Sequence, residues 1–220
     1  MNLCMIGTGY VGLVSGTCFA DLGNKVLCLD KDEKKIKMLK SGISPIYEPG
    51  LDELIKKNYI AKRLSFTSDI KQALNLSDII FICVGTPTKK GSTKVDLSYV
   101  LKCTKEIFKY TKRKKIIVTK STVPIGTGDE IEKILKKKKK LFTVISNPEF
   151  LREGEAIRDF RFPDRIVIGS NEKNSFSIMR KLYAPLINKG SKFFTTTRRG
   201  AELIKYASNA FLATKITFIN

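Results

Sequence analysis

Three glycines near the beginning of the chain have the spacing of a dinucleotide-binding loop. They belong to the run Gly7-Thr8-Gly9-Tyr10-Val11-Gly12, which follows a short apolar segment and opens an amphipathic one. In such a loop the first glycine permits a tight turn, the second lets the backbone approach a diphosphate, and the third lets the helix pack closely on the strand. The diphosphate lies at the helix N-terminus, where backbone N–H groups lack partners within the helix. The run therefore predicts a dinucleotide site.

An acidic residue stands where such a site needs one. Asp30 lies 18 residues after Gly12, at the end of the next apolar segment. A carboxylate at this place can bind the ribose hydroxyls of adenosine. It would repel a 2′-phosphate, so NAD is preferred over NADP, although Lys31, Lys34 and Lys35 weaken that preference.

Three later segments carry hydroxyls, backbone amides or carboxylates directly after predicted strands. Ligands bind beyond the carboxyl ends of parallel strands, so all three segments are expected on the same rim as the glycine loop. Taken singly, each Thr-Pro pair among them is ordinary turn chemistry, but three such segments on one rim favour a site. They are Val84-Gly85-Thr86-Pro87-Thr88, Ser121-Thr122-Val123-Pro124 and Asn147-Pro148-Glu149-Phe150-Leu151-Arg152-Glu153-Gly154.

Two pairs of polar residues have helical spacing. Glu149 and Glu153 are four residues apart and share a face if their segment is helical, so they could divide a base role from a cofactor contact. Acidic residues in the first turn of a solvated helix explain them equally well. Lys205 and Asn209 have the same spacing, and a cation beside an amide could stabilise an oxyanion. Taken alone, this second pair fits an ordinary polar helix face better.

The composition excludes several kinds of chemistry. The chain has no histidine, which removes imidazole metal sites and the Ser-His and Cys-His nucleophile pairs. The five cysteines are odd in number, form no C-x-x-C pair and stand in apolar segments, so we expect buried thiols in a reducing compartment and no metal site. No apolar run approaches the length of a membrane span, and the N-terminus lacks the basic region of a secretory signal. The chain is predicted to be cytoplasmic.

Strands and helices that alternate along the chain must position these residues. Strand–helix alternation with continuously apolar strands predicts an α/β fold with a Rossmann-like doubly wound parallel sheet, covered on both faces. Asp69 and Asp96 are predicted helix N-caps, and Gly23 and Gly42 are predicted to follow helix ends. The predicted strands are 3–6, 25–29, 79–84, 116–119, 142–145, 166–168 and 192–196, and the predicted helices are 11–22, 33–39, 97–110, 128–135, 175–186 and 198–220.

The charge balance is strongly positive. Lys and Arg number 41 against 21 Asp and Glu, a formal net charge of +20. Such an excess would favour a polyanion, but lysine spread over solvated faces explains it better. The basic runs 112–115 and 136–140 lie between predicted helices and strands and contain no aromatic residue, so both are expected to face solvent. We therefore expect no nucleic-acid or membrane partner.

Several motifs together resemble the UDP-glucose/GDP-mannose dehydrogenase family, and the resemblance covers essentially the whole chain. The resemblance implies that the protein oxidises the 6-hydroxyl of UDP-glucose twice, with two NAD, to give UDP-glucuronate. A related dehydrogenase of GDP-mannose or of a UDP-N-acetyl sugar stays open, as does a non-catalytic NAD- or polyanion-binding module. The motifs are the glycine loop, Gly85-Thr86-Pro87, Ser121 to Thr127, Asn147 to Gly154, Phe162 to Val167 and Ala201 to Phe211.

The resemblance also implies a role for each matching residue. Glu149 would be the acid/base, Lys205 and Asn209 would steady the oxyanion in both steps, and Thr122 would belong to the catalytic set. The substrate would contact Glu149, Phe150, Leu151, Arg152, Glu153, Lys205 and Asn209. The adenosine and diphosphate of NAD would contact Gly7, Thr8, Gly9, Tyr10, Val11, Gly12, Asp30 and Lys35, and the rest of the cofactor Val84, Gly85, Thr86, Pro87, Thr88, Ser121, Thr122, Val123 and Glu153.

One departure from the family pattern concerns the nucleophilic cysteine. The family carries it in a Cys-Phe-Pro-Lys-Asp-type motif that none of the five cysteines occupies, and Cys83, the nearest to the rim, is interpreted as core. We therefore expect residues 1–197 to form the NAD-binding domain and residues 198–220 to be the truncated start of a long α-helix of the middle domain. On this interpretation the chain binds NAD, lacks the nucleophile and the UDP-binding domain, and comes from a homodimer.

Overall fold

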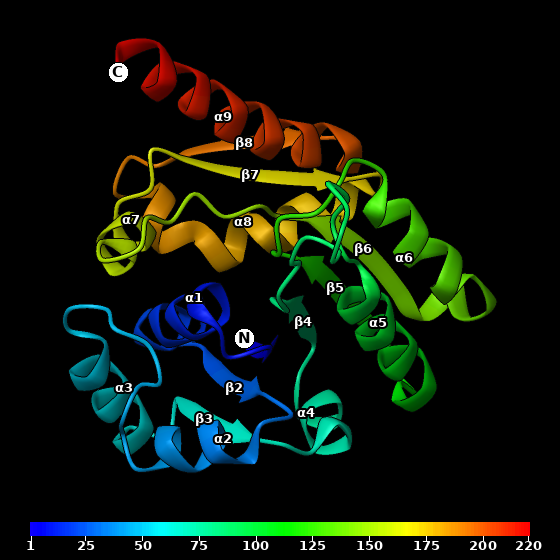
Figure 1. Ribbon diagram of the computed structural model, residues 1–220. Helices are drawn as coiled ribbons and strands as arrows, with labels where there is room; N and C mark the ends of the chain where they lie inside the picture. The colour runs from blue at the N-terminus through cyan, green and yellow to red at the C-terminus, as the bar shows by residue number, and fades with distance from the viewer.

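The computed structural model describes residues 1–220, which form one eight-stranded sheet with helices on both faces (Figure 1). The strand order is β3-β2-β1-β4-β5-β6-β7-β8. The first six strands in this order are parallel, as expected for nearly continuous apolar strands joined by helical connections. The strands are β1 (Asn2–Ile6), β2 (Lys25–Leu29), β3 (Leu64–Thr67), β4 (Ile79–Ile82), β5 (Lys115–Thr119), β6 (Phe142–Ser146), β7 (Arg165–Ser170) and β8 (Lys192–Thr196).

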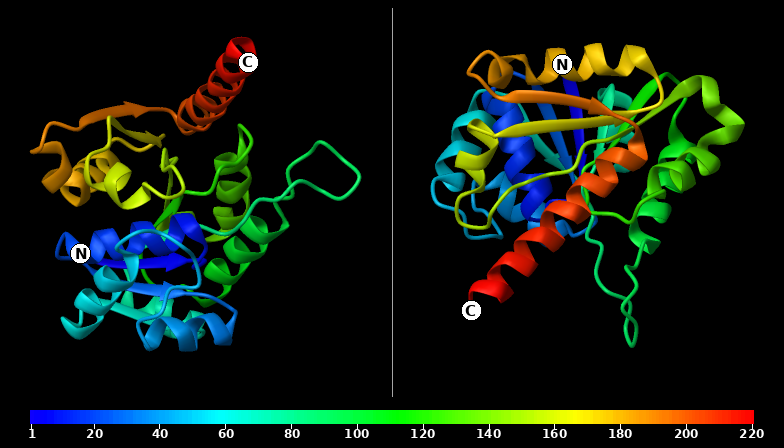
Figure 2. Two further views of the ribbon diagram at one scale, coloured as in Figure 1. Left: turned by 60° about the vertical axis from the view of Figure 1, so that its left-hand side comes forward. Right: turned by 90° about the horizontal axis from the view of Figure 1, so that it is seen from above.

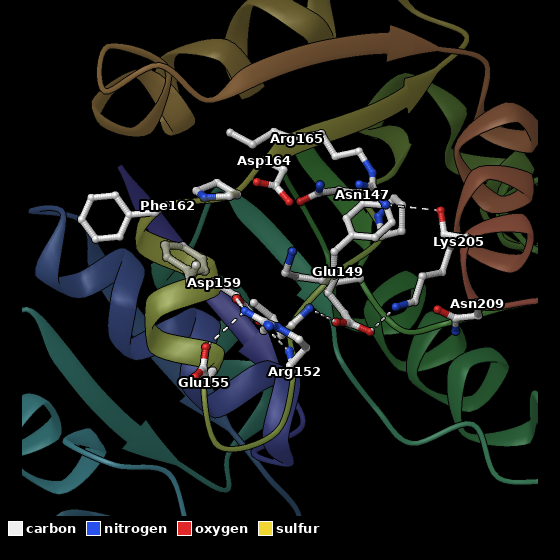
Figure 3. Close-up of a pocket in the computed structure, with 18 of the residues that line it drawn as sticks. Asn147, Glu149, Arg152, Glu155, Asp159, Phe162, Asp164, Arg165, Lys205 and Asn209 are labelled. Carbon is white, nitrogen blue, oxygen red and sulfur yellow. Dashed lines mark hydrogen bonds and ion pairs between the residues drawn. The ribbon is translucent and has the colours of Figure 1, made fainter. Parts of the chain in front are cut away.

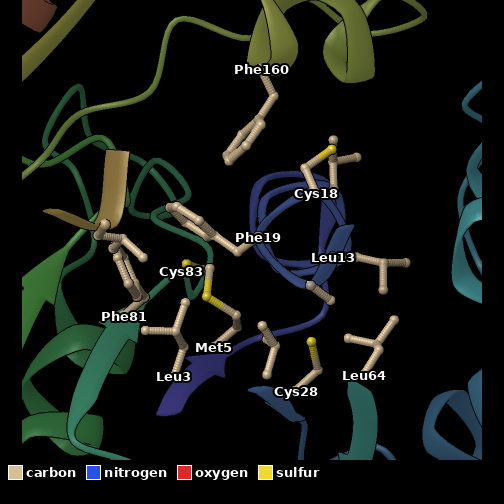
Figure 4. Close-up of a cluster of buried hydrophobic side chains, with 14 of the residues drawn as sticks. Leu3, Met5, Leu13, Cys18, Phe19, Cys28, Leu64, Phe81, Cys83 and Phe160 are labelled. Atoms are coloured by element: carbon tan, nitrogen blue, oxygen red, sulfur yellow. The ribbon is translucent and has the colours of Figure 1, made fainter. Parts of the chain in front are cut away.

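Each face of the sheet buries its own hydrophobic core. One core lies under α1, α2, α3, α7 and α8, where Phe19 of α1 packs against Phe81 of β4 and Phe160 of α7 (Figure 4). The other lies under α4, α5 and α6. The helices are α1 (Tyr10–Asp21), α2 (Glu33–Lys40), α3 (Leu51–Ile60), α4 (Ile70–Leu76), α5 (Ser98–Tyr110), α6 (Thr127–Leu135), the 3-10 helix η1 (Lys136–Leu141), α7 (Ala156–Arg161), α8 (Lys173–Ile187) and α9 (Arg198–Ile219).

The predicted fold class is confirmed, and most predicted elements agree with the structure within two or three residues. Gly23 and Gly42 follow helix ends with positive φ, and Asp69 caps α4 by accepting two backbone N–H groups. The cap at Asp96 is wrong in position, because α5 begins after Leu97 and Asp96 accepts only the Ser98 N–H. The elements α3, β3 and α7 were not among the predicted ones, and of α4 only the cap at Asp69 was predicted.

The sheet departs from the predicted parallel arrangement at one edge. Strand β7 pairs antiparallel with β6, and β8 pairs parallel with β7. The connection from β6 to β7 contains only the six-residue α7, which packs on α1 and does not return across the sheet. Strand β7 therefore starts beyond the carboxyl edge of β6 and runs back toward it, so residues 147–170 build one wall of that edge.

A second correction concerns the basic run 112–115. Lys115 does not face solvent: it belongs to β5, is buried, and its amine donates a hydrogen bond to the Ser77 carbonyl. Burial lowers the pKa of Lys115 to about 8. A lysine is tolerated at this position because the carbonyl of the neighbouring connection satisfies its amine.

The cysteines agree with the sequence expectation. All five are buried free thiols, and Cys83 belongs to the core under α1. Among the helices, none combines the length and the hydrophobicity that a membrane span requires. The loop between β4 and α5 and the second half of α9 extend away from the body of the molecule (Figure 2).

Candidate active site

The glycine loop connects β1 to α1 at the centre of the sheet, and each of its glycines meets different surroundings. Gly7 has a φ of +100°, and a Cβ there would lie 2.8 Å from the Cys83 carbonyl oxygen. A Cβ on Gly12 would lie 2.0 Å from the Gly7 carbonyl oxygen, so the helix can approach the strand only without it. Gly9 differs, since nothing lies within 4 Å of a Cβ placed there. The space above Gly9 is open to a ligand.

The N-terminus of α1 has no partner of its own. Gly9 occupies the N-cap position without a side-chain hydrogen bond, and the first turn holds no acidic residue. Its N–H groups and positive dipole end are therefore available to an anion. This end of α1 fits the diphosphate of a dinucleotide.

Asp30, directly after β2, holds the loop in place. The Thr8 backbone N–H and hydroxyl both donate to one oxygen of the Asp30 carboxylate, at 2.8 and 2.7 Å. Burial alone would raise the pKa of Asp30, but the hydrogen bonds from Thr8 outweigh it and hold that pKa below its usual range. Lys35 acts in the same direction from α2. Asp30 is thus a charged acceptor that borders the open space above the loop.

The segments after β4 and β5 meet beside the glycine loop. The Ser121 hydroxyl donates to the Val84 carbonyl at 2.7 Å, and the Thr86 hydroxyl donates to the Thr122 carbonyl at 2.8 Å. Two residues of the predicted set point elsewhere: Val123 is buried in the core, and Thr88 is exposed and pairs with Val95 in the projecting loop. The structure thus brings together residues 84–86 with residues 121 and 122.

An open cavity of about 910 Å³ lies beyond the carboxyl ends of β5 and β6. Its walls come from residues 147–166 on one side and from α9 on the other (Figure 3). Of the predicted substrate residues, Glu149, Phe150, Leu151, Arg152, Lys205 and Asn209 line this cavity. Thr122 lines a second, much smaller cavity that shares Pro148 and Lys205 with the first.

At the inner end of the large cavity, Glu149 and Lys205 form a buried ion pair. The Lys205 amine lies 2.9 Å from one Glu149 carboxylate oxygen, and the two side chains are 9% and 10% exposed. The other carboxylate oxygen accepts the Leu151 N–H at 2.6 Å. Charges this buried are paired and hydrogen-bonded or are not retained, so both side chains have a fixed geometry. The pair places a carboxylate and an ammonium within reach of one ligand atom.

The first turns of α9 are fastened to α6, which fixes the position of Lys205. The Glu202 carboxylate accepts the backbone N–H of Gly126 at 2.6 Å and of Gly128 at 2.9 Å, at the N-terminus of α6. Arg198 pairs with Asp129 and Glu132 on the same helix. Because Asn209 lies one turn after Lys205, both side chains point to the cavity from one helix (Figure 3).

The segment with Glu149 and Glu153 corrects one expectation. It is not helical, and Glu153 is exposed and does not line the cavity. The segment is held instead by Glu48, a buried carboxylate that accepts the Tyr10 hydroxyl and the N–H groups of Gly154 and Ile157. Burial and the hydrogen bond to Glu48 raise the pKa of Tyr10 to about 12. Tyr10 and Glu48 thereby join the cofactor loop to the cavity wall.

Three further residues of the site were not predicted from the sequence. The Glu48 and Glu202 carboxylates act through contacts with residues at least 38 positions away, for which no local pattern exists. Lys120 lines the large cavity although it is 4% exposed. Its position between β5 and Ser121 was the available signal, since polar residues at the carboxyl end of a parallel strand face the ligand edge.

Comparisons with known proteins agree with this geometry. Residues 1–187 match the model of the UDP-glucose/GDP-mannose dehydrogenase family, NAD binding domain. The chain is 54% identical over 224 residues to the UDP-glucose 6-dehydrogenase of Rhizobium meliloti, covering 100% of the chain and 51% of that relative. The chain therefore spans about half the length of the curated relatives it matches.

Solved structures show the same likeness. A UDP-glucose dehydrogenase from Pyrobaculum islandicum superposes with a TM-score of 0.94 at 38% identity, over 100% of this chain and 52% of that one. A ternary complex of the GDP-mannose dehydrogenase from Pseudomonas aeruginosa gives a TM-score of 0.93 at 36% identity, over 99% and 51%.

Proposed function

The chain belongs to the UDP-glucose/GDP-mannose dehydrogenase family, with an NAD-binding domain, and we propose that it is the cofactor half of an enzyme that oxidises UDP-glucose to UDP-glucuronate. The observation that carries the proposal is the buried Glu149–Lys205 pair, which faces a cavity beside the cofactor loop. The name of the Rhizobium relative supports UDP-glucose as the substrate.

The cofactor residues fit NAD. The space above Gly9, the uncapped N-terminus of α1 and the charged acceptor at Asp30 match the diphosphate and ribose of a dinucleotide. The nicotinamide end would lie near residues 84–86 and 121–122, with Glu153 near Tyr10 at the cofactor side of the loop. When bound, NAD accepts the hydride that leaves the sugar.

The residues of this chain would handle the proton and the developing charge. The Glu149 carboxylate is placed to accept a proton from the sugar hydroxyl or from an attacking water. The Lys205 ammonium and the Asn209 amide are placed to donate hydrogen bonds to an oxygen that gains negative charge. Phe150, Leu151 and Arg152 would hold the substrate against the wall, where Arg152 is itself fixed by Asp159 at 2.6 Å. We further propose that the nucleophilic cysteine and the uridine diphosphate site lie outside these residues.

The domain boundary and the assembly follow the same proposal. Strand β8 ends at Thr196 and Thr197 caps α9, which supports residues 1–197 as the NAD-binding domain and residues 198–220 as the first part of a middle-domain helix. Phe211 and Phe218 of that helix are 73% and 89% exposed, which supports a homodimer packed on α9. The cytoplasmic location stays a prediction.

The test uses the complete gene product and measures NADH formation with UDP-glucose, GDP-mannose and UDP-N-acetylglucosamine. We expect two NADH for each UDP-glucose consumed and much slower turnover of the other two. Glu149→Gln should abolish most turnover while NAD still binds, whereas Glu53→Gln, an exposed change on α3, should have no effect. If another sugar nucleotide is turned over faster, that sugar nucleotide replaces UDP-glucose as the proposed substrate. If none of the three is turned over, the proposed dehydrogenase activity is refuted.

A further inference from the structure

Lys120 is a buried lysine whose amine has no partner in the chain. Its backbone N–H donates to the Ile82 carbonyl at 2.9 Å, which fixes the residue directly after β5. The side chain is 4% exposed and lines the large cavity, but its amine makes no hydrogen bond and no ion pair. Burying an unpaired ammonium is costly, and lysine is almost never fully buried without a partner. The amine therefore takes its partner from the cavity, either water or a bound ligand.

The carboxylates around the cavity do not serve as that partner. Glu149 is engaged by Lys205 and by the Leu151 N–H, and Asp159 and Glu155 are paired with Arg152. Asp164 lines the outer wall and is exposed. Of the remaining cations, Arg165 stacks on Phe150 at 4.2 Å and donates a hydrogen bond to the Ser208 hydroxyl, and Arg158 and Lys215 are exposed.

The inner end of the cavity therefore has a positive balance when Lys120 is protonated. The charges of Glu149 and Lys205 cancel, and the protonated Lys120 amine supplies one further cation. Burial lowers the pKa of Lys120, Cys83 and Glu149 oppose this, and Lys205 adds to it. A bound anion would favour the protonated amine. An anion bound among these three residues would satisfy the amine and restore a neutral balance.

The proposed reaction produces such an anion at the reacting carbon. Oxidation of the neutral 6-hydroxymethyl group releases two hydrides to two NAD, takes one oxygen from water and frees three protons, which leaves a carboxylate. We propose that Lys120 is a further catalytic residue, whose amine binds the oxygen that becomes charged and so favours the carboxylate over the alcohol. This inference rests on the proposed function.

The experiment compares the affinities of two ligands that differ only at this carbon. With the complete gene product, titration calorimetry gives the dissociation constants of UDP-glucuronate and UDP-glucose. Lys120→Met should weaken the binding of UDP-glucuronate by about tenfold or more and the binding of UDP-glucose by less than about threefold, because only UDP-glucuronate carries a charge at this carbon. Lys120→Arg keeps the charge and should restore most of the lost affinity.

Lys115→Met is the matched control, because Lys115 is a buried lysine at the start of β5, whereas Lys120 directly follows its end, and the Lys115 amine has the Ser77 carbonyl as partner. It should lower the melting temperature and leave both affinities unchanged, whereas Lys120→Met should leave the melting temperature unchanged or raise it. If Lys120→Met does not fold, Lys120→Gln decides by the same two constants.

Equal weakening of both ligands, or no weakening of UDP-glucuronate, would overturn the role of Lys120. If the unchanged protein binds neither nucleotide sugar, the proposed function fails first and the role of Lys120 fails with it. That outcome is seen before any substitution is made, so the two failures are distinguishable.

Discussion

Gly9 and Gly12 are three positions apart, and the structure predicts that the same substitution spares the stability of the protein at Gly9 and lowers it at Gly12. A Cβ at Gly12 would lie 2.0 Å from the Gly7 carbonyl oxygen and 2.9 Å from the Cys83 Cβ. Both neighbours belong to the sheet side of the loop and cannot turn away. A Cβ at Gly9 would meet nothing within 4 Å, and its φ of −73° is open to alanine.

The magnitudes follow from these contacts. In Gly12→Ala, a Cβ at 2.0 Å from the Gly7 carbonyl oxygen forces α1 to move roughly 1 Å from the strands, and overpacking against backbone should cost about 3 kcal/mol in the free energy of unfolding. Gly9→Ala should change the free energy of unfolding by less than about 1 kcal/mol, the difference between glycine and alanine as an N-cap. Its methyl group would occupy the space of the diphosphate and so displace it from one backbone N–H. Loss of one charge-assisted hydrogen bond of about 1.5–3 kcal/mol would weaken NAD binding roughly ten- to hundredfold.

Two measurements on the same preparations test this reasoning. Urea unfolding reports the free energy of unfolding, and titration calorimetry reports the dissociation constant of NAD. We expect Gly9→Ala to fold normally and bind NAD poorly, and Gly12→Ala to lose stability as well as binding. Wild-type NAD affinity in Gly9→Ala would refute the placement of the diphosphate, and wild-type stability in Gly12→Ala would refute the packing argument.

Three further predictions rest on side chains around the loop and the sheet. The lowered pKa of Lys115 means that the folded state binds fewer protons than the unfolded state between pH 8 and about 10.5, so wild type should gain stability over Lys115→Met across that interval, by at most about 3 kcal/mol. A constant difference in urea unfolding from pH 7.5 to 10.5 would contradict it. Asp30→Ala should weaken NAD binding about tenfold and reduce the preference for NAD over NADP, which titration with each dinucleotide measures. An unchanged preference would mean that Asp30 does not face the ribose. Tyr10→Phe removes the hydroxyl between Glu48 and Gly154 and should lower the free energy of unfolding by about 1–3 kcal/mol. The control is Tyr59→Phe, which should leave the free energy of unfolding unchanged because the Tyr59 hydroxyl makes no hydrogen bond.

The strands and the cofactor loop could be predicted from the sequence because their signals are local. The predicted strands 25–29 and 192–196 agree with β2 and β8, and the glycine run stands between β1 and α1. The short elements α3 and β3 were missed, and α4 was predicted only by its cap at Asp69, because each spans ten residues or fewer, where periodicity alone decides little.

The reversed edge and much of the site could not be predicted, because tertiary contacts decide them. The direction of β7 depends on how α7 packs on α1, which no residue of β7 encodes. Lys115 begins β5 and Lys120 directly follows it, so the sequence does not distinguish their roles. The contacts of their amines do: the Lys115 amine binds the Ser77 carbonyl, and Lys120 lines the large cavity, where a ligand can bind. Glu149 and Lys205 were predicted separately, and their pairing required the position of α9.

The attachment of α9 also has a consequence for the order in which the molecule folds. The predicted NAD contacts other than Glu153 lie within residues 7–123, whereas Arg198 and Glu202 attach α9 to α6. Synthesis delivers α9 after all of the strands that carry the cofactor loop. We expect the dinucleotide site to begin to form before α9 is made, and the Glu149–Lys205 pair to form only after α9 has docked on α6.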